Sequence, residues 1–253
     1  MRADQLLVDR GLASSRSQAQ RLIAAGVRWR LLQGQPWKAV AKNGEELSAA
    51  VELELADDAE ARYVSRGGLK LEGALRAAGI AATGRTCLDV GQSTGGFTDC
   101  LLRHGAARVV GVDVGRDQLH ASLRADPRVR CLEQVNAREL SAAALAGELP
   151  VGGFGLVVGD LSFISLTLVL PAMVPLLSEA GDLLVLVKPQ FELQPGDIGK
   201  GGIVRDPALF AQVEIRIRRA CAAGGLAVAG WFDSPIAGGD GNREFFIHAR
   251  RAP

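Results

Sequence analysis

Hydrophobic positions follow two different periods within residues 1–60. Apolar residues first recur at helical spacing, over residues 6–12 and again over residues 19–23. They then alternate with charged residues over residues 27–31 and 51–55, which is the spacing of half-buried strands. The pattern predicts a small α+β domain in which two short helices are followed by strands.

A different pattern begins at Gly67, where helical stretches alternate with short apolar runs. Helices are expected over residues 67–79 and 208–223. Such alternation predicts a doubly wound, Rossmann-like α/β domain built on a largely parallel sheet. We therefore divide the chain into a first domain of residues 1–60, a linker of residues 61–66 and a second domain of residues 67–253. Seven strands are expected, at Thr86–Val90, Arg108–Val112, Val129–Glu133, Gly155–Gly159, Asp182–Val187, Leu226–Phe232 and Glu244–Ala249.

The composition is compatible with this arrangement. The charged residues are unevenly distributed along the chain. The chain has 253 residues, of which 48% are hydrophobic, and a net charge of +1. A chain of this length can bury the cores of one medium and one small domain. Residues 1–42 hold eight Lys and Arg against two Asp, whereas residues 43–60 hold seven acids and no Lys or Arg. The basic N-terminal segment suggests a docking surface for a polyanion.

Several classes of protein are disfavoured. The four cysteines include no C-x-x-C pair, so neither a zinc site nor a disulfide framework is expected, and the usage fits a reducing cytosol. The three histidines are too dispersed to suggest a metal site. Asp4 and Asp9 interrupt the segment where a signal peptide would be apolar, and the longest apolar run, residues 166–177, is too short to span a bilayer. We expect a cytoplasmic protein that binds no metal and no membrane.

The most informative segment is Leu88–Thr98, a strand end followed by a glycine-rich turn and a helix start. Its glycines do not follow the G-x-G-x-x-G spacing of dinucleotide-binding turns, which disfavours a NAD-dependent dehydrogenase. Small residues after an acidic residue suit S-adenosylmethionine (AdoMet), whose ammonium and carboxylate groups a carboxylate and backbone groups can hold. The candidate cofactor-binding residues are Asp89, Gly91, Ser93, Thr94, Gly95, Gly96 and Phe97, with Asp113 for the ribose hydroxyls and Asn136 near the adenine.

Four charged residues lie at the ends of predicted elements: Lys70, Asp160, Lys188 and Glu244. Taken singly, each is best explained as the place where a buried element meets water. Together and in this order they resemble the Lys-Asp-Lys-Glu tetrad of RNA ribose 2′-O-methyltransferases. A ribose hydroxyl is a very weak acid, so its methylation needs a base, and a lysine can serve when burial and a neighbouring ammonium lower its pKa. The resemblance makes Lys188 the candidate base, which Asp160 orients while Lys70 and Glu244 shape the site.

Residues 1–60 resemble the S4-type RNA-binding domain of a ribosomal small-subunit protein and of pseudouridine synthases. The departure is at residues 31–34, where that family usually has a Val-Asn-Gly turn. The resemblance implies contacts to RNA phosphates, although a basic face of a small domain can also be merely solvated. A glycine-rich loop, residues 192–205, either closes over RNA or is an ordinary connection. The candidate RNA-binding residues are Arg10, Arg16, Arg21, Arg28 and Arg30, with Lys200 in that loop.

Resemblance to one family extends over nearly the whole chain. Segments 64–71, 93–100, 161–166, 187–192 and 199–207 are similar to those of the TlyA family, also labelled hemolysin-like, of bacterial rRNA cytidine 2′-O-methyltransferases. The resemblance implies AdoMet as cofactor and rRNA in the small ribosomal subunit, the large one or both as partner.

Two departures and two alternatives accompany this resemblance. Gln92 replaces a residue that is usually small and would crowd the cofactor turn, and residues 61–64 read Ala-Arg-Tyr-Val where some members have Arg-x-Trp-Val. A non-catalytic ribosome-binding or assembly factor is the main alternative function. A membrane-active haemolysin is disfavoured, because the sequence offers neither a membrane span nor a long cationic amphipathic helix.

Overall fold

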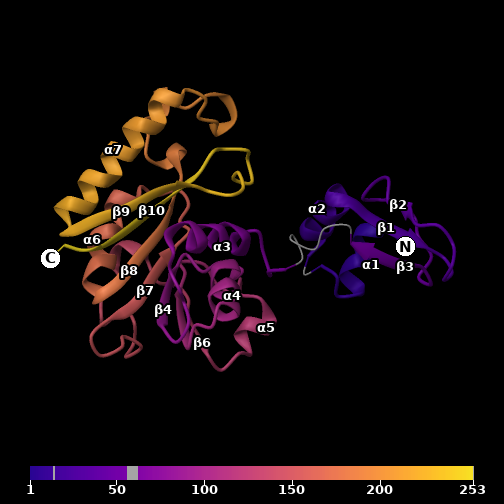
Figure 1. Ribbon diagram of the computed structural model, residues 1–253, viewed down its shortest axis with the longest axis horizontal. Helices are drawn as coiled ribbons and strands as arrows, with labels where there is room; N and C mark the ends of the chain where they lie inside the picture. The colour runs from indigo at the N-terminus through magenta and orange to yellow at the C-terminus, as the bar shows by residue number, and fades with distance from the viewer. Residues whose placement is uncertain (14, 56–61, 253) are drawn as a thin grey trace. The chain divides into compact units, whose positions relative to one another are not determined.

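The protein divides into two compact units, Met1–Arg66 and Gly67–Pro253 (Figure 1). The computed structural model describes residues 1–13, 15–55 and 62–252. The end of the predicted first domain, residues 56–60, and the first predicted linker residue, 61, lie outside the described residues. Each unit has its own sheet and helices, so we describe the two separately.

The first unit is an α+β domain, as predicted. Helices α1 (Ala3–Asp9) and α2 (Arg16–Gly26) precede a three-stranded antiparallel sheet of order β2-β1-β3. Helix α2 is capped at its start by Ser15, whose hydroxyl accepts a hydrogen bond of 3.2 Å from the Gln18 backbone N–H. The core of the unit includes Leu6, Leu7, Leu22, Ile23 and Val27. The strands are β1 (Val27–Arg30), β2 (Lys38–Ala39) and β3 (Glu52–Leu55).

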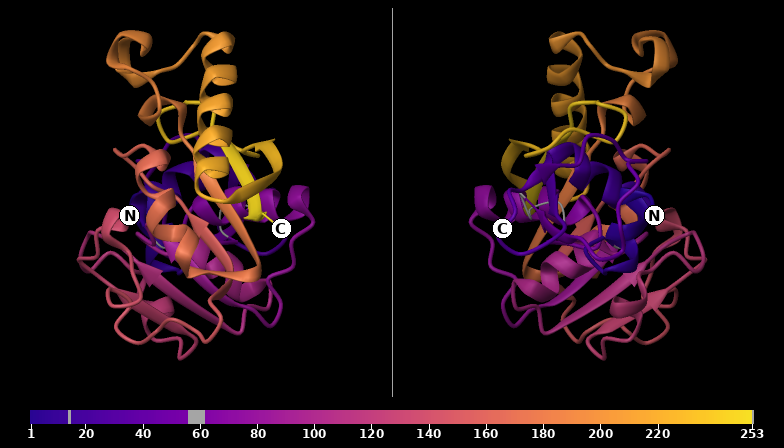
Figure 2. Two further views of the ribbon diagram at one scale, coloured as in Figure 1. Left: turned by 90° about the vertical axis from the view of Figure 1, so that its left-hand side faces the viewer. Right: turned by 90° about the vertical axis from the view of Figure 1, so that its right-hand side faces the viewer.

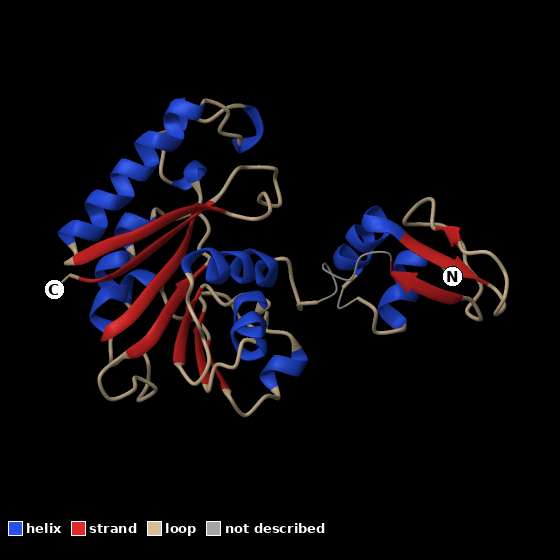
Figure 3. Cartoon of the chain, in the orientation of Figure 1, coloured by secondary structure: helices blue, strands red, loops and turns tan. Residues whose placement is uncertain are grey.

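The second unit contains a seven-stranded sheet of order β6-β5-β4-β7-β8-β10-β9 (Figure 3). The first five strands in this order run parallel, and β10 is antiparallel to both of its neighbours. All seven predicted strands are present. Their bounds are β4 (Thr86–Val90), β5 (Arg108–Val112), β6 (Val129–Leu132), β7 (Phe154–Gly159), β8 (Leu177–Val187), β9 (Leu226–Asp233) and β10 (Phe245–Arg251).

One strand begins well before its predicted start. Strand β8 begins at Leu177 and not at Asp182, because Leu177 already pairs with Phe154 of β7. The pairing shifts register between Phe154 and Leu156, and residues 178–181, which read Ser-Glu-Ala-Gly, interrupt the apolar run there. Backbone pairing extends a strand through residues whose side chains give no periodic signal.

Helices cover both faces of this sheet, so the fold is doubly wound (Figure 2). Apolar residues of α6 and α7, such as Met173 and Ile217, belong to the same buried core as Leu88 and Val90 of β4. On the other face, Phe97 of α4 stacks on Phe246 of β10 with ring centroids 6.1 Å apart. No helix in the described residues is long and apolar enough to cross a bilayer.

The helices of this unit are α3 (Gly67–Ala78), α4 (Gly96–Arg103), α5 (Ala121–Arg124), α6 (Leu170–Met173) and α7 (Pro207–Ala223). Short 3-10 helices span Ala137–Glu139, Leu166–Leu168, Val174–Leu176, Pro189–Phe191, Pro195–Asp197 and Lys200–Gly202.

Candidate functional site

The glycine-rich turn after β4 is held tightly between the two neighbouring strands. Gly91 donates its backbone N–H to Val112 O of β5 at 2.9 Å, and Asp160 after β7 donates its N–H to Val90 O at 3.0 Å. Gly91 has φ +83°, and a β-carbon there would lie 2.6 Å from Asp160 O. Only glycine fits this position, and its lack of a side chain leaves the ends of the parallel strands open.

A cavity of about 440 Å³ lies at these strand ends. This volume falls within the usual range of small-molecule sites, roughly 300–1,000 Å³. Of the nine candidate cofactor residues, the structure places four in its lining: Gly91, Ser93, Asp113 and Asn136. Residues 160–164 line the opposite part of the cavity.

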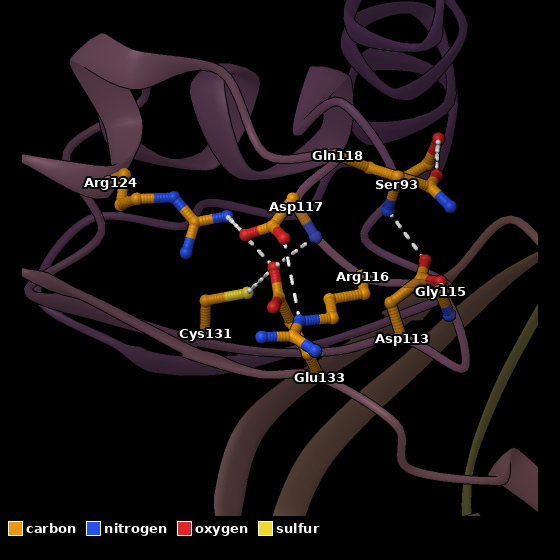
Figure 4. Close-up of polar contacts among 9 residues, drawn as sticks. All are labelled: Ser93, Asp113, Gly115, Arg116, Asp117, Gln118, Arg124, Cys131 and Glu133. Carbon is orange, nitrogen blue, oxygen red and sulfur yellow. Dashed lines mark hydrogen bonds and ion pairs between the residues drawn. The ribbon is translucent and has the colours of Figure 1, made fainter.

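Asp113 is fixed at the edge of this cavity by backbone donors. Its Oδ2 accepts a hydrogen bond of 2.7 Å from Ser93 N, and its Oδ1 accepts one of 2.7 Å from Gly115 N (Figure 4). Ser93 has φ +48°, and its Oγ donates to Gln118 Oε1 at 3.2 Å. A carboxylate held in this way has lone pairs left for the hydroxyls of a bound ribose. Gln118 also lines the cavity, but it follows an irregular segment and no motif in the sequence points to it.

Beyond Asp113, charged side chains tie the segment after β5 to the end of β6 (Figure 4). Arg124 of α5 lies 2.8 Å from Glu133 Oε1, and the same oxygen accepts the Asp117 backbone N–H at 3.0 Å. Asp117 has φ +55°. These contacts stabilise the cavity wall that carries Gln118.

The other five candidate cofactor residues, Asp89, Thr94, Gly95, Gly96 and Phe97, are not among the residues that line the cavity. Asp89 is fully buried, because strand alternation turns its side chain toward α4, where its Oδ2 accepts a bond of 2.7 Å from Thr98 Oγ1. Burial raises the pKa of Asp89 to about 7, and the Thr98 hydrogen bond opposes that rise. Gly95 has φ +95°, which lets the turn enter α4. These residues shape the turn whose Gly91 and Ser93 line the cavity.

Gln92, the departure from the family pattern in this turn, is not among the residues that line the cavity. Its side chain is buried on the far side of the turn, and its Nε2 donates to Thr98 Oγ1 at 2.9 Å. It passes over Gly111 of β5, which has no side chain to meet it.

The four tetrad residues come together as two ion pairs. Lys70 Nζ lies 2.6 Å from Glu244 Oε2, and both side chains are buried. Lys188 Nζ lies 2.6 Å from Asp160 Oδ1 and donates to Ser162 Oγ at 2.8 Å. Lys70, Lys188 and Glu244 line a second cavity of about 600 Å³.

The antiparallel insertion of β10 explains how Glu244 reaches this place. Phe245 at the start of β10 pairs with Val187 at the end of β8. Glu244, just before β10, and Lys188, just after β8, therefore lie at the same edge of the sheet. A residue at the amino end of a strand thus joins residues from the carboxyl ends of the parallel strands.

The two cavities adjoin. Ser162 and Phe163 line both, and Asp160 of the first cavity pairs with Lys188 of the second. Phe163 is 91% exposed, has φ +62°, and its ring centroid lies 5.2 Å from that of Phe191. Neither Ser162 nor Phe163 was assigned a role from the sequence, although both lie in segment 161–166, one of the segments that carry the family resemblance.

Buried polar side chains anchor the loops around the second cavity. Glu192 accepts hydrogen bonds of 2.6 Å from Ser165 Oγ and from Leu166 N, and burial raises its pKa. Asn242 Oδ1 accepts from Val204 N at 2.9 Å, and its Nδ2 donates to Gly202 O at 2.9 Å. The glycine-rich loop is therefore tied at both ends. The candidate RNA residue of this loop, Lys200, is exposed and does not line the cavity.

The predicted basic face of β1 is paired with acids. Strands β1 and β3 pair in a register that places Arg28 opposite Glu54 and Arg30 opposite Glu52, and the charged atoms lie 2.8 Å and 2.5 Å apart. The surface formed by these residues of β1 and β3 is thus one of mixed charge. Both alternating patterns are visible in the sequence, but their register is not.

The remaining candidate RNA residues have partners within the same unit. Arg16 Nη2 lies 3.2 Å from Asp4 Oδ2, and hydrogen bonds from Arg2 hold the pKa of the buried Asp4 carboxyl well below its usual range. Arg10 donates to Ala49 O at 2.6 Å, and Arg21 donates to Ser17 O at 3.2 Å. Among the described residues no group of His, Cys, Asp and Glu is placed to hold a metal ion.

Known proteins share this architecture along the whole chain. The chain matches the FtsJ-like methyltransferase family over residues 63–251 and the S4 domain over residues 1–26. It is 48% identical over 250 residues to the 16S/23S rRNA (cytidine-2'-O)-methyltransferase TlyA of Mycobacterium tuberculosis, covering 98% of this chain and 89% of the relative. It is 38% identical over 253 residues to Hemolysin A of Brachyspira hyodysenteriae, covering 98% of this chain and 99% of the relative.

A solved structure is also similar to this chain. A protein of Streptococcus thermophilus described as a candidate hemolysin aligns with a TM-score of 0.75 and 40% identity, covering 100% of this chain and 88% of that one. The chain therefore belongs to the FtsJ-like methyltransferases and, among them, to the TlyA family with its N-terminal S4 domain.

Proposed function

We propose that this protein transfers a methyl group from AdoMet to the 2′-hydroxyl of a cytidine in ribosomal RNA. The observation that carries the proposal is the junction of the two cavities, where Lys188 and Asp160 form an ion pair across the boundary. The first cavity suits the cofactor and the second suits the nucleotide. The choice of cytidine and of rRNA follows the name of the relative in Mycobacterium tuberculosis.

The residues of the first cavity fit AdoMet. Asp113 offers carboxylate lone pairs at the end of β5, where a ribose is expected in this kind of sheet. Gly91 leaves the backbone of the turn accessible, and Asn136 lies in the lining beyond it. AdoMet bound there supplies a sulfonium methyl group.

The residues of the second cavity supply a base for the ribose hydroxyl and a positive charge beside its oxygen. Lys188 Nζ would accept the proton of the 2′-hydroxyl as the oxygen takes the methyl group from the sulfonium, and S-adenosylhomocysteine would leave as a neutral thioether. Asp160 holds that nitrogen at the boundary of the two cavities. The ammonium of Lys70 contributes positive charge near the developing oxyanion, and Glu244 keeps this ammonium in place.

The first unit recruits the RNA. Exposed ion pairs such as Arg28–Glu54 are worth only about 0.2–1 kcal/mol, so a phosphate can replace the glutamate at little cost. Arg10, Arg16, Arg21 and Arg30 provide further positive charge on this unit, and Lys200 does so beside the second cavity.

The experiment is transfer of labelled methyl from AdoMet to isolated, unmethylated small and large ribosomal subunits. Lys188→Met, which keeps the side-chain length but lacks the amine, is run beside the native protein. Label that resists alkaline cleavage at a single ribose, and that the variant does not produce, is the expected result. Calorimetry shows whether the variant still binds AdoMet.

The same experiment identifies the main alternative. A protein that binds AdoMet and ribosomal subunits but transfers no methyl group to either subunit would contradict the proposal. It would indicate a binding or assembly factor, whose function Lys188→Met would leave intact.

A further inference from the structure

We propose that Ser162 is a positioning residue for Lys188: its hydroxyl sets the direction of the lysine lone pair. The inference rests on the proposed function, in which Lys188 is the base. It starts from one contact, the hydrogen bond of 2.8 Å that Lys188 Nζ donates to Ser162 Oγ.

The geometry of an amine gives this contact its importance. A neutral lysine nitrogen has two N–H donors and one lone pair in a tetrahedral arrangement. If Asp160 Oδ1, at 2.6 Å, accepts one N–H and Ser162 Oγ accepts the other, rotation about the Cε–Nζ bond is fixed. The lone pair then occupies the remaining direction. With Asp160 as the single acceptor, rotation about the Cε–Nζ bond would not be fixed and neither would the direction of the lone pair.

The Ser162 side chain is also uncharged, which suits a neighbour of a base. A second carboxylate beside Lys188 would favour the ammonium form and so oppose its action as a base. A hydroxyl accepts the hydrogen bond without adding negative charge. Because Ser162 lines both cavities, it acts where the methyl donor and the ribose meet.

The backbone holds Ser162 on both sides. Two residues before it, Asp160 N donates to Val90 O at 3.0 Å. A few residues after it, Leu166 N donates to the buried Glu192. Ser162 is an exposed residue, but these anchors set the position of its backbone. It is thus a fixed second acceptor for Lys188.

The test compares Ser162→Ala with Ser162→Thr, which keeps a hydroxyl, in single-turnover methyl transfer to the ribosomal subunit. We expect Ser162→Ala to lower the rate of methyl transfer about tenfold, the upper end of the loss expected for one hydrogen bond. The dissociation constant of AdoMet and the KM for the subunit should change by less than about twofold, since Ser162 acts on Lys188 and not on binding. Ser162→Thr should recover most of the rate.

Ser165→Ala is the matched control, because Ser165 lies in the same loop but bonds to Glu192. An equal loss of rate in Ser165→Ala and Ser162→Ala would show a general loosening of the loop and overturn the proposal. So would a full native rate in Ser162→Ala, or a Ser162→Thr variant as slow as Ser162→Ala.

A second measurement does not depend on methyl transfer. Acetic anhydride acylates lysine amines, and mass spectrometry of the Lys188 peptide gives the rate of its acylation. Loss of one acceptor should raise that rate several-fold in Ser162→Ala and leave it unchanged in Ser165→Ala. An unchanged rate in Ser162→Ala would contradict the proposed contact. If the native protein methylates no rRNA, the proposed function fails, and the acylation rates still decide whether Ser162 holds Lys188.

Discussion

The Gln92 side chain lies over Gly111, in the space that a side chain at position 111 would need. Gln92 belongs to the turn after β4, and Gly111 lies in β5 directly opposite Asp89. Gln92 thus fits below the glycine-rich turn because Gly111 in the neighbouring strand has no side chain. The amide also reaches Thr98, so it joins the hydrogen bonds around Asp89.

Substituting Gly111→Ala should therefore destabilise the protein. The new methyl group meets the Gln92 amide, and overpacking of this kind costs about 1–3 kcal/mol in the free energy of unfolding. Gln92→Ala in the same chain removes the obstacle, so the double variant should recover most of that loss. Thermal unfolding of the two single variants and the double variant measures the coupling. Additive effects would mean that the two positions do not compete for this space.

The pairing of Lys70 with Glu244 predicts that stability and activity can be separated. Lys70→Met leaves the buried Glu244 carboxylate without its partner and should cost about 3–5 kcal/mol of unfolding free energy. Adding Glu244→Gln removes the unpaired charge and should restore at least half of that stability. Calorimetric unfolding and methyl transfer are measured on both variants. The double variant should fold and be inactive, and native activity in it would show that the pair is only structural.

Asp89 predicts a specific dependence of stability on pH. Burial raises its pKa from 3.8 to about 7 in the folded protein, so between these pH values the unfolded chain loses a proton that the folded protein keeps. The protonated carboxyl therefore stabilises the fold fully below about pH 4, and this contribution is lost as the pH rises toward 7. Asp89→Asn does not titrate. Denaturant unfolding from pH 4 to 7 should show stability falling more steeply in the native protein than in Asp89→Asn, and parallel curves would contradict the assignment.

The pair of Arg28 with Glu54 offers a test of RNA binding in the first unit. If Arg28 exchanges Glu54 for a phosphate, Arg28→Gln should weaken binding to the ribosomal subunit and reduce the slope of log affinity against log salt by about one. Glu54→Gln removes the competitor and should tighten binding.

Arg128→Gln is the matched control for this prediction, because Arg128 is likewise exposed and paired, with Asp126 at 2.7 Å. Filter binding at several salt concentrations gives both the affinities and the slopes. Equal losses in Arg28→Gln and Arg128→Gln would assign the effect to overall charge.

Much of the fold could be predicted because its signals are local. The strand β4, the turn at Gly91 and the start of α4 lie within one short segment, and their periodicity and glycines need no distant partner to be recognised. The same holds for α2, where Ser15 caps the helix within its own first turn. The seven strands of the second unit were likewise recognisable from apolar runs, apart from the first five residues of β8, which read Leu-Ser-Glu-Ala-Gly.

Candidate residues could be named from sequence, but their partners could not. Lys70, Asp160, Lys188 and Glu244 are identifiable by type and order, whereas their division into two ion pairs depends on β10 lying antiparallel beside β8. An alternating strand pattern is the same whichever neighbour it pairs with.

The sequence by itself determined the fold class, the two kinds of domain, the glycine-rich turn after β4 and the types of charged residue at the strand ends, because each depends on neighbours along the chain. Only the tertiary structure decided that Asp89 points beneath the turn, that Arg28 faces Glu54, and that Ser162 meets Lys188. The last two contacts join residues far apart in sequence, and all three depend on strand order, on register or on the face to which a side chain turns.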